Sequence, residues 1–201
     1  MCGIIGYVGG RPCEELILSG LERLEYRGYD SAGMVLLDTE GLRTVRAVGN
    51  LAELRKAAHA TGIDASPATM GMGHTRWATH GRVTEANAHP HSDASGRISV
   101  VMNGIVENYA RLRSELQDDG VVFLSETDAE VIPHLIARHY EGDLVAAVRT
   151  VIGEIEGHFA FVAASVDEPH RLVAARRECP MVLGVGEGER FIASAIPAFL
   201  P

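Results

Sequence analysis

The chain has 201 residues, which suits one domain with a substantial hydrophobic core, and a formal net charge of −9, which excludes nucleic-acid binding through a positive surface. No apolar run reaches the roughly 18 residues of a membrane span, and the amino-terminal stretch is too short for a signal peptide. The three cysteines, Cys2, Cys13 and Cys179, share no short spacing, so neither a disulfide framework nor a Cys-x-x-Cys metal site is predicted, and we expect a protein of the reducing cytoplasm.

The first part of the chain predicts short strands interleaved with helices. An apolar run bounded by glycines over 3–9 indicates a buried strand, and apolar positions at helical spacing indicate a helix over 13–27. Two strands follow over 33–38 and 43–48, joined by a short turn, and a second helix is predicted over 51–60.

The second part begins with an apolar strand over 97–104 that ends in Asn-Gly, a strong turn signal. Helices are predicted over 106–120 and 143–155 from the spacing of their apolar residues. The last quarter predicts four strands separated by turn residues: 158–165, 171–176, 181–185 and 190–194.

A further helix is predicted over 125–142. Thr127 and Glu130 have capping-box spacing, and Asp128 falls in the predicted first turn, where a negative charge is favourable. Pro133 lies inside the pattern, so we expect a kink or a late start.

The order of the elements is strands, helix, strands, helices and strands. Strands that follow one another across short turns imply antiparallel pairing, so the steady alternation of a doubly wound fold is not expected. Two sheets packed on each other with helices outside would fit this order. The chain ends in Ser-Ala-Ile-Pro-Ala-Phe-Leu-Pro without a polar tail, and we expect this end to be a cut within a longer protein.

Cys2 stands directly behind the initiator methionine, where a small residue permits removal of that methionine. Removal would leave a thiol and an α-amino group on one residue, with pKa values of about 8.5 and 7.7–8.0. A nucleophile and a base of matched pKa is the arrangement used by N-terminal threonine nucleophiles. The alternative is that Cys2 is a small buried hydrophobe or stays behind Met1, and this stretch alone leaves both open.

Residues 73–81, GHTRWATHG, hold an unusual density of polar and cyclic side chains, and Arg76 offers a guanidinium fork for a carboxylate. Four histidines raise a metal site as an alternative: His74, His80, His89 and His91. No Asp, Glu or Cys falls at a recognised ligand spacing, so no metal is predicted. A structural polar loop beside the core is the other alternative.

Three further signals point to chemistry, each with a simpler structural explanation. Asn103 and Gly104 could offer a side-chain amide and a backbone N–H to an oxyanion, or form only a turn. Asp128 could hold an ammonium group, and Arg27 and Asp30 lie in a glycine-containing connection that could belong to a site. A substrate with an α-amino acid head and a reactive amide would use the thiol, the amide pair, the guanidinium and the carboxylate together.

The chain resembles the glutaminase domains of glutamine–fructose-6-phosphate aminotransferases, which are class II amidotransferases and N-terminal-nucleophile hydrolases. Six motifs carry the resemblance in order along essentially the whole chain: MCGIIGYVG, LEYRGYDSAG, GHTRWATHG, NAHPH, NGIVEN and SETDAEVI. The first motif is shared with other amidotransferases, whereas the second and third are more specific. The resemblance implies an α+β fold, a four-layer αββα sandwich with two antiparallel sheets.

The resemblance also implies a mechanism on L-glutamine without a cofactor. Cys2 would be the nucleophile after loss of Met1, forming a γ-glutamyl thioester that water hydrolyses to glutamate. Its amine would shuttle the proton to the departing ammonia, while Asn103 and Gly104 stabilise the oxyanion.

Substrate contacts follow from the same motifs. Arg76 would bind the α-carboxylate of glutamine, and Asp128 its α-ammonium group. Further positions are implied around the substrate, with Trp77 gating ammonia and the others in contact with glutamine or beside the nucleophile: Arg27, Gly28, Trp77, Thr79 and His80.

In the full-length enzymes of this family, which the resemblance implies are homodimers, ammonia passes to a sugar-phosphate isomerase domain that makes glucosamine 6-phosphate from fructose 6-phosphate. That domain is absent from residues 1–201, so we expect one glutaminase domain, truncated at its C-terminal end.

Three positions depart from the family pattern: Met102 replaces a histidine, Cys179 a serine and Ala195 an aspartate. Two alternatives therefore stay open. The chain could be the glutaminase domain of a divergent paralogue that serves another ammonia acceptor, or a non-catalytic glutamine-binding module on the same fold.

Overall fold

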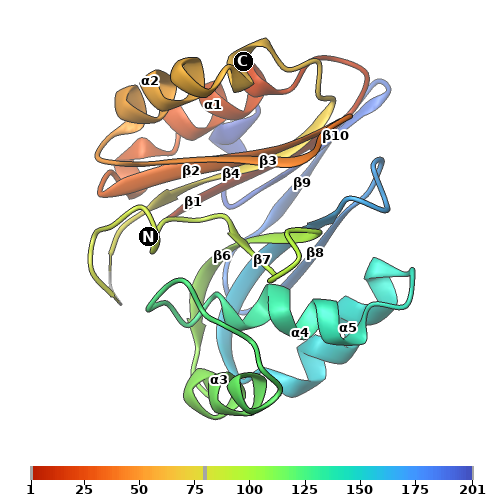
Figure 1. The fold of residues 1–201 in the computed structure, drawn as a ribbon. Helices are drawn as coiled ribbons and strands as arrows, with labels where there is room; N and C mark the ends of the chain where they lie inside the picture. The colour runs from red at the N-terminus through yellow and green to blue at the C-terminus, as the bar shows by residue number, and fades with distance from the viewer. Residues whose placement is uncertain (1, 79–80, 201) are drawn as a thin grey trace.

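The computed structural model describes residues 2–78 and 81–200 as four layers, with two antiparallel sheets facing each other between two layers of helices (Figure 1). The larger sheet has the strand order β3-β2-β4-β1-β10-β9, and the smaller has the order β5-β6-β7-β8. The α+β sandwich expected from the sequence is therefore confirmed.

The strands of the larger sheet are β1 (Gly3–Val8), β2 (Ser31–Asp38), β3 (Gly41–Val48), β4 (Met70–Arg76), β9 (Val182–Gly186) and β10 (Glu189–Ala193). Those of the smaller sheet are β5 (His91–Ser92), β6 (Ile98–Val106), β7 (Gly157–Ser165) and β8 (Leu172–Arg177). The outer layers contain α1 (Glu14–Glu22) and α2 (Leu51–Thr61) on the larger sheet, and α3 (Tyr109–Asp118), α4 (Val131–His139) and α5 (Leu144–Glu154) on the smaller (Figure 1). Short 3-10 helices are η1 (Glu25–Arg27), η2 (Ile63–Ala65) and η3 (Ile196–Ala198).

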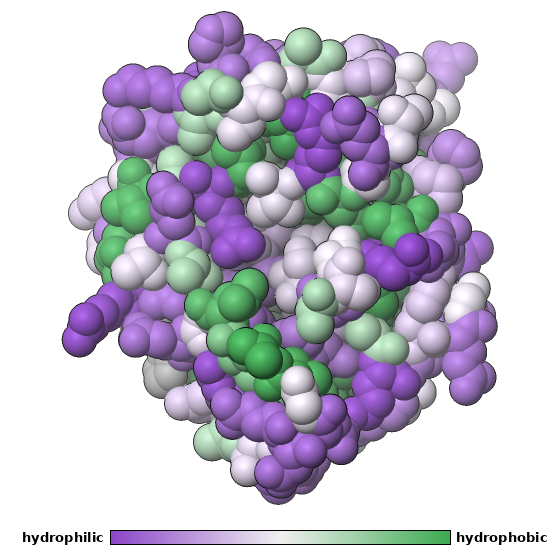
Figure 2. Space-filling view, viewed as in Figure 1, coloured by the Kyte–Doolittle hydropathy of each residue, from purple (hydrophilic) through white to green (hydrophobic). Residues whose placement is uncertain are grey.

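Strand β1 lies inside the larger sheet and is buried on both faces. Alternate side chains of a strand point to opposite faces, so Ile4 packs with Val101 between the two sheets while Ile5 packs with Ile17 of α1. This explains why the strand is a continuous apolar run in the sequence. No helix within the described residues is long and apolar enough to cross a membrane. Figure 2 shows small, separated apolar patches among hydrophilic side chains on one face.

The predicted turn at Asn103-Gly104 is wrong, because β6 continues through both residues to Val106. Gly104 has φ +103°, and a Cβ there would lie 2.0 Å from the carbonyl oxygen of His158 on the paired strand β7. Glycine therefore allows the strand to stay paired where any side chain would collide, which a turn signal cannot reveal.

The predicted capping box before α4 is also absent. The Glu130 carboxylate accepts hydrogen bonds from the amides of Leu124 and Ser125 instead, while the Thr127 hydroxyl contacts His91. Helix α4 begins at Val131, so the late start expected from Pro133 is confirmed.

Helix α5 offers a direct test of local stability. Its N-cap residue Asp143 accepts hydrogen bonds from the amides of Val145 and Ala146. We predict that Asp143→Ala lowers the free energy of unfolding by about 1 kcal/mol, because two amides lose their partner. Asp143→Asn should stay close to the unsubstituted protein, because asparagine caps equally well. Urea denaturation would measure both variants, and an equal loss in both would contradict the capping role.

Candidate active site

The nucleophile proposed from the sequence stands at the start of β1, next to the end of β4. The register pairs Gly3 with Thr75, and the Thr75 hydroxyl accepts the Gly3 amide at 3.1 Å. The Trp77 amide donates to Cys2 Sγ at 3.2 Å, so the sulfur is held where β1 begins and β4 ends. Burial raises the pKa of the Cys2 thiol even though the Trp77 amide opposes this. The thiol therefore needs a neighbouring base to become a nucleophile at neutral pH.

Asn103 reaches the same place from the other sheet. Its side-chain Nδ2 donates to the carbonyl oxygen of Cys2 at 2.9 Å, and its Oδ1 lies 3.0 Å from Nε2 of His74. The hydrogen bond between sheets brings an amide donor beside the sulfur-bearing residue. Gly104 follows directly along β6, with a φ of +103°. The structure thus brings Asn103 beside Cys2, with Gly104 the next residue along β6.

Arg76 ends β4 and is 4% exposed. Its guanidinium donates to the carbonyl oxygens of Arg82 at 3.1 Å and Gly81 at 3.4 Å. Burial lowers the pKa of Arg76, while the nearby Asp30 and Asp128 carboxylates oppose this and favour the charged form. The planar guanidinium of an arginine, which stays charged, is suited to bind a carboxylate ligand through two hydrogen bonds.

Asp128 lies before α4 rather than in its first turn, so the helix-dipole role is wrong and a site role remains. Its Oδ2 accepts the amide of Val106 at 2.7 Å, which fixes the carboxylate at the end of β6, and the residue is 7% exposed. Arg76 and Asp128 thus present opposite charges close to the Cys2–Asn103 contact, as an α-amino acid would require.

Gly28 packs against the backbone of Arg76 and Trp77, and a Cβ there would lie 2.8 Å from the Arg76 carbonyl carbon. It therefore supports the chain segment whose amide holds the sulfur. Arg27 points toward β10, donating to the Ser194 carbonyl at 3.3 Å. The side chain of Trp77 is half exposed and contacts the Tyr29 ring edge-on, with ring centroids 5.5 Å apart. Two further predicted site residues, Thr79 and His80, lie outside the described residues.

Several residues that shape the site were not singled out by sequence reasoning. The Ser194 hydroxyl accepts the Ile4 amide at 3.0 Å and so fixes β1 from the far end of the chain, for which no sequence signal exists. Asn87 donates to the Arg82 carbonyl at 3.0 Å and to Glu126 at 3.2 Å, linking the loop beside Arg76 to the loop before Asp128. Its place in the NAHPH motif was the available signal.

Three of the four histidines considered for a metal site are described, and their rings contact one another behind Asn103, His74 stacked on His89 and His91 edge-on to His89. The rings of His74 and His89 have centroids 4.2 Å apart, and those of His89 and His91 4.5 Å apart. Burial lowers the pKa of His74 to about 4, that of His91 to about 3, and that of His89 well below its ordinary value. Within residues 2–78 and 81–200, no group of His, Cys, Asp and Glu is arranged to hold a metal ion. The three histidines therefore form a buried cluster of neutral rings.

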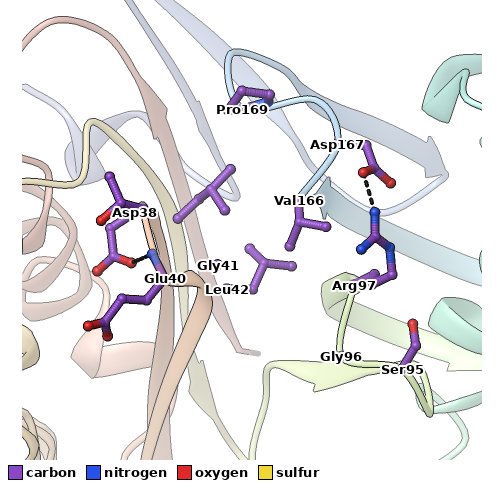
Figure 3. Close-up of a pocket in the computed structure, with 12 residues that line it drawn as sticks. Asp38, Glu40, Gly41, Leu42, Ser95, Gly96, Arg97, Val166, Asp167 and Pro169 are labelled. Atoms are coloured by element: carbon purple, nitrogen blue, oxygen red, sulfur yellow. Dashed lines mark hydrogen bonds and ion pairs between the residues drawn. The ribbon is translucent and has the colours of Figure 1, made fainter.

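A cavity of about 660 Å³ lies away from this site, at the other end of β2 (Figure 3). Three turns line it, over 38–42, 95–97 and 166–169. Its charged groups are already paired: Arg97 forms an ion pair with Asp167, and Asp38 and Glu40 both form ion pairs with Arg43, at 3.4 Å and 3.8 Å. None of the proposed site residues lines it.

The buried histidines predict how stability depends on pH. The pKa of His74 falls from 6.5 to about 4 on folding, so the unfolded chain binds more protons between these values. The contribution of neutral His74 to the free energy of unfolding is therefore complete above pH 6.5. It is lost as the pH falls toward 4, which lowers the free energy of unfolding by roughly 3 kcal/mol for His74 alone. Urea denaturation at several pH values across this window measures the loss. A constant free energy of unfolding would contradict the burial of neutral rings.

Comparison with known proteins gives a consistent result. Residues 74–201 match the family described as "Glutamine amidotransferase domain". Over its whole length the chain is 52% identical to the glutamine–fructose-6-phosphate aminotransferases [isomerizing] of Mycolicibacterium paratuberculosis and Symbiobacterium thermophilum, and it spans 33% and 32% of their lengths. The solved structure of the glutamine phosphoribosylpyrophosphate amidotransferase of B. subtilis matches with a TM-score of 0.82 at 24% identity, covering 98% of this chain and 43% of that one. At that identity the likeness concerns the fold alone.

Proposed function

The chain belongs to the family of glutamine amidotransferase domains, and from this premise we propose that it hydrolyses the side-chain amide of L-glutamine to glutamate and ammonia. The observation that carries the proposal is the hydrogen bond from Asn103 to the Cys2 carbonyl at 2.9 Å, because a side-chain amide beside the Cys2 thiol is suited to act as an oxyanion donor. The opposite charges of Arg76 and Asp128 nearby support an α-amino acid as the substrate.

The first half of the reaction would proceed from a Cys2 whose amino group is free. That amine takes the thiol proton, and the thiolate attacks the side-chain amide carbon of glutamine. The carbonyl oxygen becomes negative in the tetrahedral intermediate, where Asn103 Nδ2 and the Gly104 amide stabilise it. The ammonium group of Cys2 then protonates the leaving nitrogen, the carbon–nitrogen bond breaks, and ammonia departs from a γ-glutamyl thioester.

In the second half, water attacks the thioester while the Cys2 amine accepts a proton from it. The carbon–sulfur bond breaks, glutamate leaves, and the proton returns to the thiolate. Because burial raises the pKa of the thiol, the amine has to supply the base in both halves. An amine locked in a peptide bond with Met1 could not do so.

We also propose that the ammonia serves the conversion of fructose 6-phosphate to glucosamine 6-phosphate, after the name of the relatives. The chain spans about one third of their length, so the acceptor site would lie in additional polypeptide. The sugar-phosphate isomerase partner, the homodimer and the cytoplasmic location remain predictions. Met102 faces away from the site, packed in the core beneath α4, so this departure removes no oxyanion donor and gives no support to a non-catalytic module.

Covalent labelling tests the nucleophile. A glutamine analogue carrying a diazoketone should add once to Cys2 in protein that has lost Met1, and glutamate release should stop in proportion. Peptide mass mapping locates the adduct, and intact mass reports whether Met1 is present. Protein that retains Met1 provides the matched control and should stay unlabelled. Labelling at Cys13 or Cys179, or none in Met1-free protein, would refute the assignment.

Substitution of Asp128 tests substrate recognition. Asp128→Asn keeps an oxygen for the Val106 amide but removes the charge, so the KM for glutamine should rise roughly 10- to 100-fold while kcat changes less. Asp118→Asn at the exposed end of α3 is the charge-matched control and should leave both constants unchanged. Steady-state glutamate release measures both variants. An unchanged KM for Asp128→Asn would remove the ammonium-binding role.

A further inference from the structure

His74 lies on β4 and faces the smaller sheet, 1% exposed, at the level of the Cys2–Asn103 contact. Its Nε2 lies 3.0 Å from Oδ1 of Asn103. The imidazole does not reach the proposed oxyanion site itself. It contacts the oxygen of the Asn103 side-chain amide, whose nitrogen would stabilise the intermediate. The sequence singled it out only as a polar loop residue or a metal ligand.

Donor and acceptor chemistry fixes the orientation of the amide. The Cys2 carbonyl can only accept, so the side-chain atom of Asn103 that lies 2.9 Å from it has to be the NH₂ group. The oxygen of the amide then faces His74 and can only accept, which requires a proton on His74 Nε2. The reverse orientation would place two oxygens 2.9 Å apart and turn the amide oxygen toward the developing negative charge.

We propose that His74, as the neutral Nε2–H tautomer, is a positioning residue that holds the Asn103 amide with its NH₂ group toward the oxyanion. One hydrogen of that group is donated to the Cys2 carbonyl, and the second would be donated to the intermediate. The inference rests on the proposed glutaminase function, because it assigns a role in the same reaction.

The surroundings of His74 support a fixed, uncharged ring. His89 stacks against it with an interplanar angle of 29°, and His89 Nδ1 accepts the Met102 amide at 3.2 Å, directly before Asn103. Within the described part of the chain, His74 Nδ1 lies within hydrogen-bond geometry of no partner, although the Met102 backbone is close enough to His74 to oppose the lowering of its pKa. The ring is therefore anchored through Nε2, and the stacked His89 ring limits its rotation.

Two substitutions separate the Nε2 contact from the rest of the ring. Glutamine places an amide nitrogen near the position of Nε2, whereas asparagine reaches only to the position of Nδ1. His74→Gln should therefore keep most of kcat for glutamate release. His74→Asn should lower kcat roughly 10- to 100-fold with little change in KM, below the 10²- to 10³-fold typical for loss of an oxyanion donor itself. Equal activity of the two variants would overturn the proposal.

A double-mutant cycle distinguishes positioning from a structural role. If His74 acts through Asn103, then His74→Asn should have no further effect on kcat in an Asn103→Ala background. Full additivity of the two losses would contradict the proposal. Thermal unfolding of each variant checks that the comparison is made between folded proteins.

Proton–nitrogen correlation NMR of the unsubstituted chain gives a readout that does not depend on activity. The proposal predicts a protonated Nε2 and an unprotonated Nδ1 for His74, with the Nε2 proton shifting when Asn103 is replaced by alanine. A protonated Nδ1 in the neutral ring would overturn the proposal, even if the protein is an active glutaminase. Failure of the unsubstituted protein to release ammonia would refute the proposed function instead, while the spectrum still decides the tautomer.

Discussion

The hydrogen bond from the Asn103 side chain to the Cys2 carbonyl is the contact on which the candidate site depends. It joins the two sheets at 2.9 Å, at the point where the first strand begins. Together with the Trp77 amide that donates to Sγ, it fixes where Cys2 lies relative to the groups of the smaller sheet. The contact also orients the amide, because a carbonyl oxygen accepts only from the NH₂ side. One interaction thus brings together the proposed nucleophile and its proposed oxyanion donor.

The larger sheet supplies the other half of the arrangement through its register. Strand β4 pairs with β1 and carries His74 and Arg76 on the face that meets the smaller sheet, while Thr75 between them holds the Gly3 amide. The same seven-residue strand therefore fixes the nucleophile, supports the amide and presents the guanidinium. This explains why a dense run of polar residues stands at the end of an otherwise apolar strand, where burial would normally disfavour it.

Much of the architecture could be predicted because strand and helix periodicities are local properties. The antiparallel order and the late start of α4, at Val131 shortly before Pro133, both follow from neighbouring residues. Gly104 was different: its turn signal was overridden by pairing with β7, which depends on residues more than fifty positions away. The link from Ser194 to Ile4 spans 190 positions and leaves no local pattern. The motifs located the site, but only the packed sheets define which atom of Asn103 faces His74.

Trapping the intermediate tests the central claim most directly. Met1-free protein mixed with L-glutamine, quenched in acid within a single turnover and digested, should yield the peptide that begins at Cys2 with one γ-glutamyl group on its sulfur. That adduct should decay at the rate at which glutamate appears, and it should be absent from Cys2→Ala protein. Glutamate release without an adduct at Cys2, or continued release by Cys2→Ala, would contradict a mechanism in which this residue is the nucleophile.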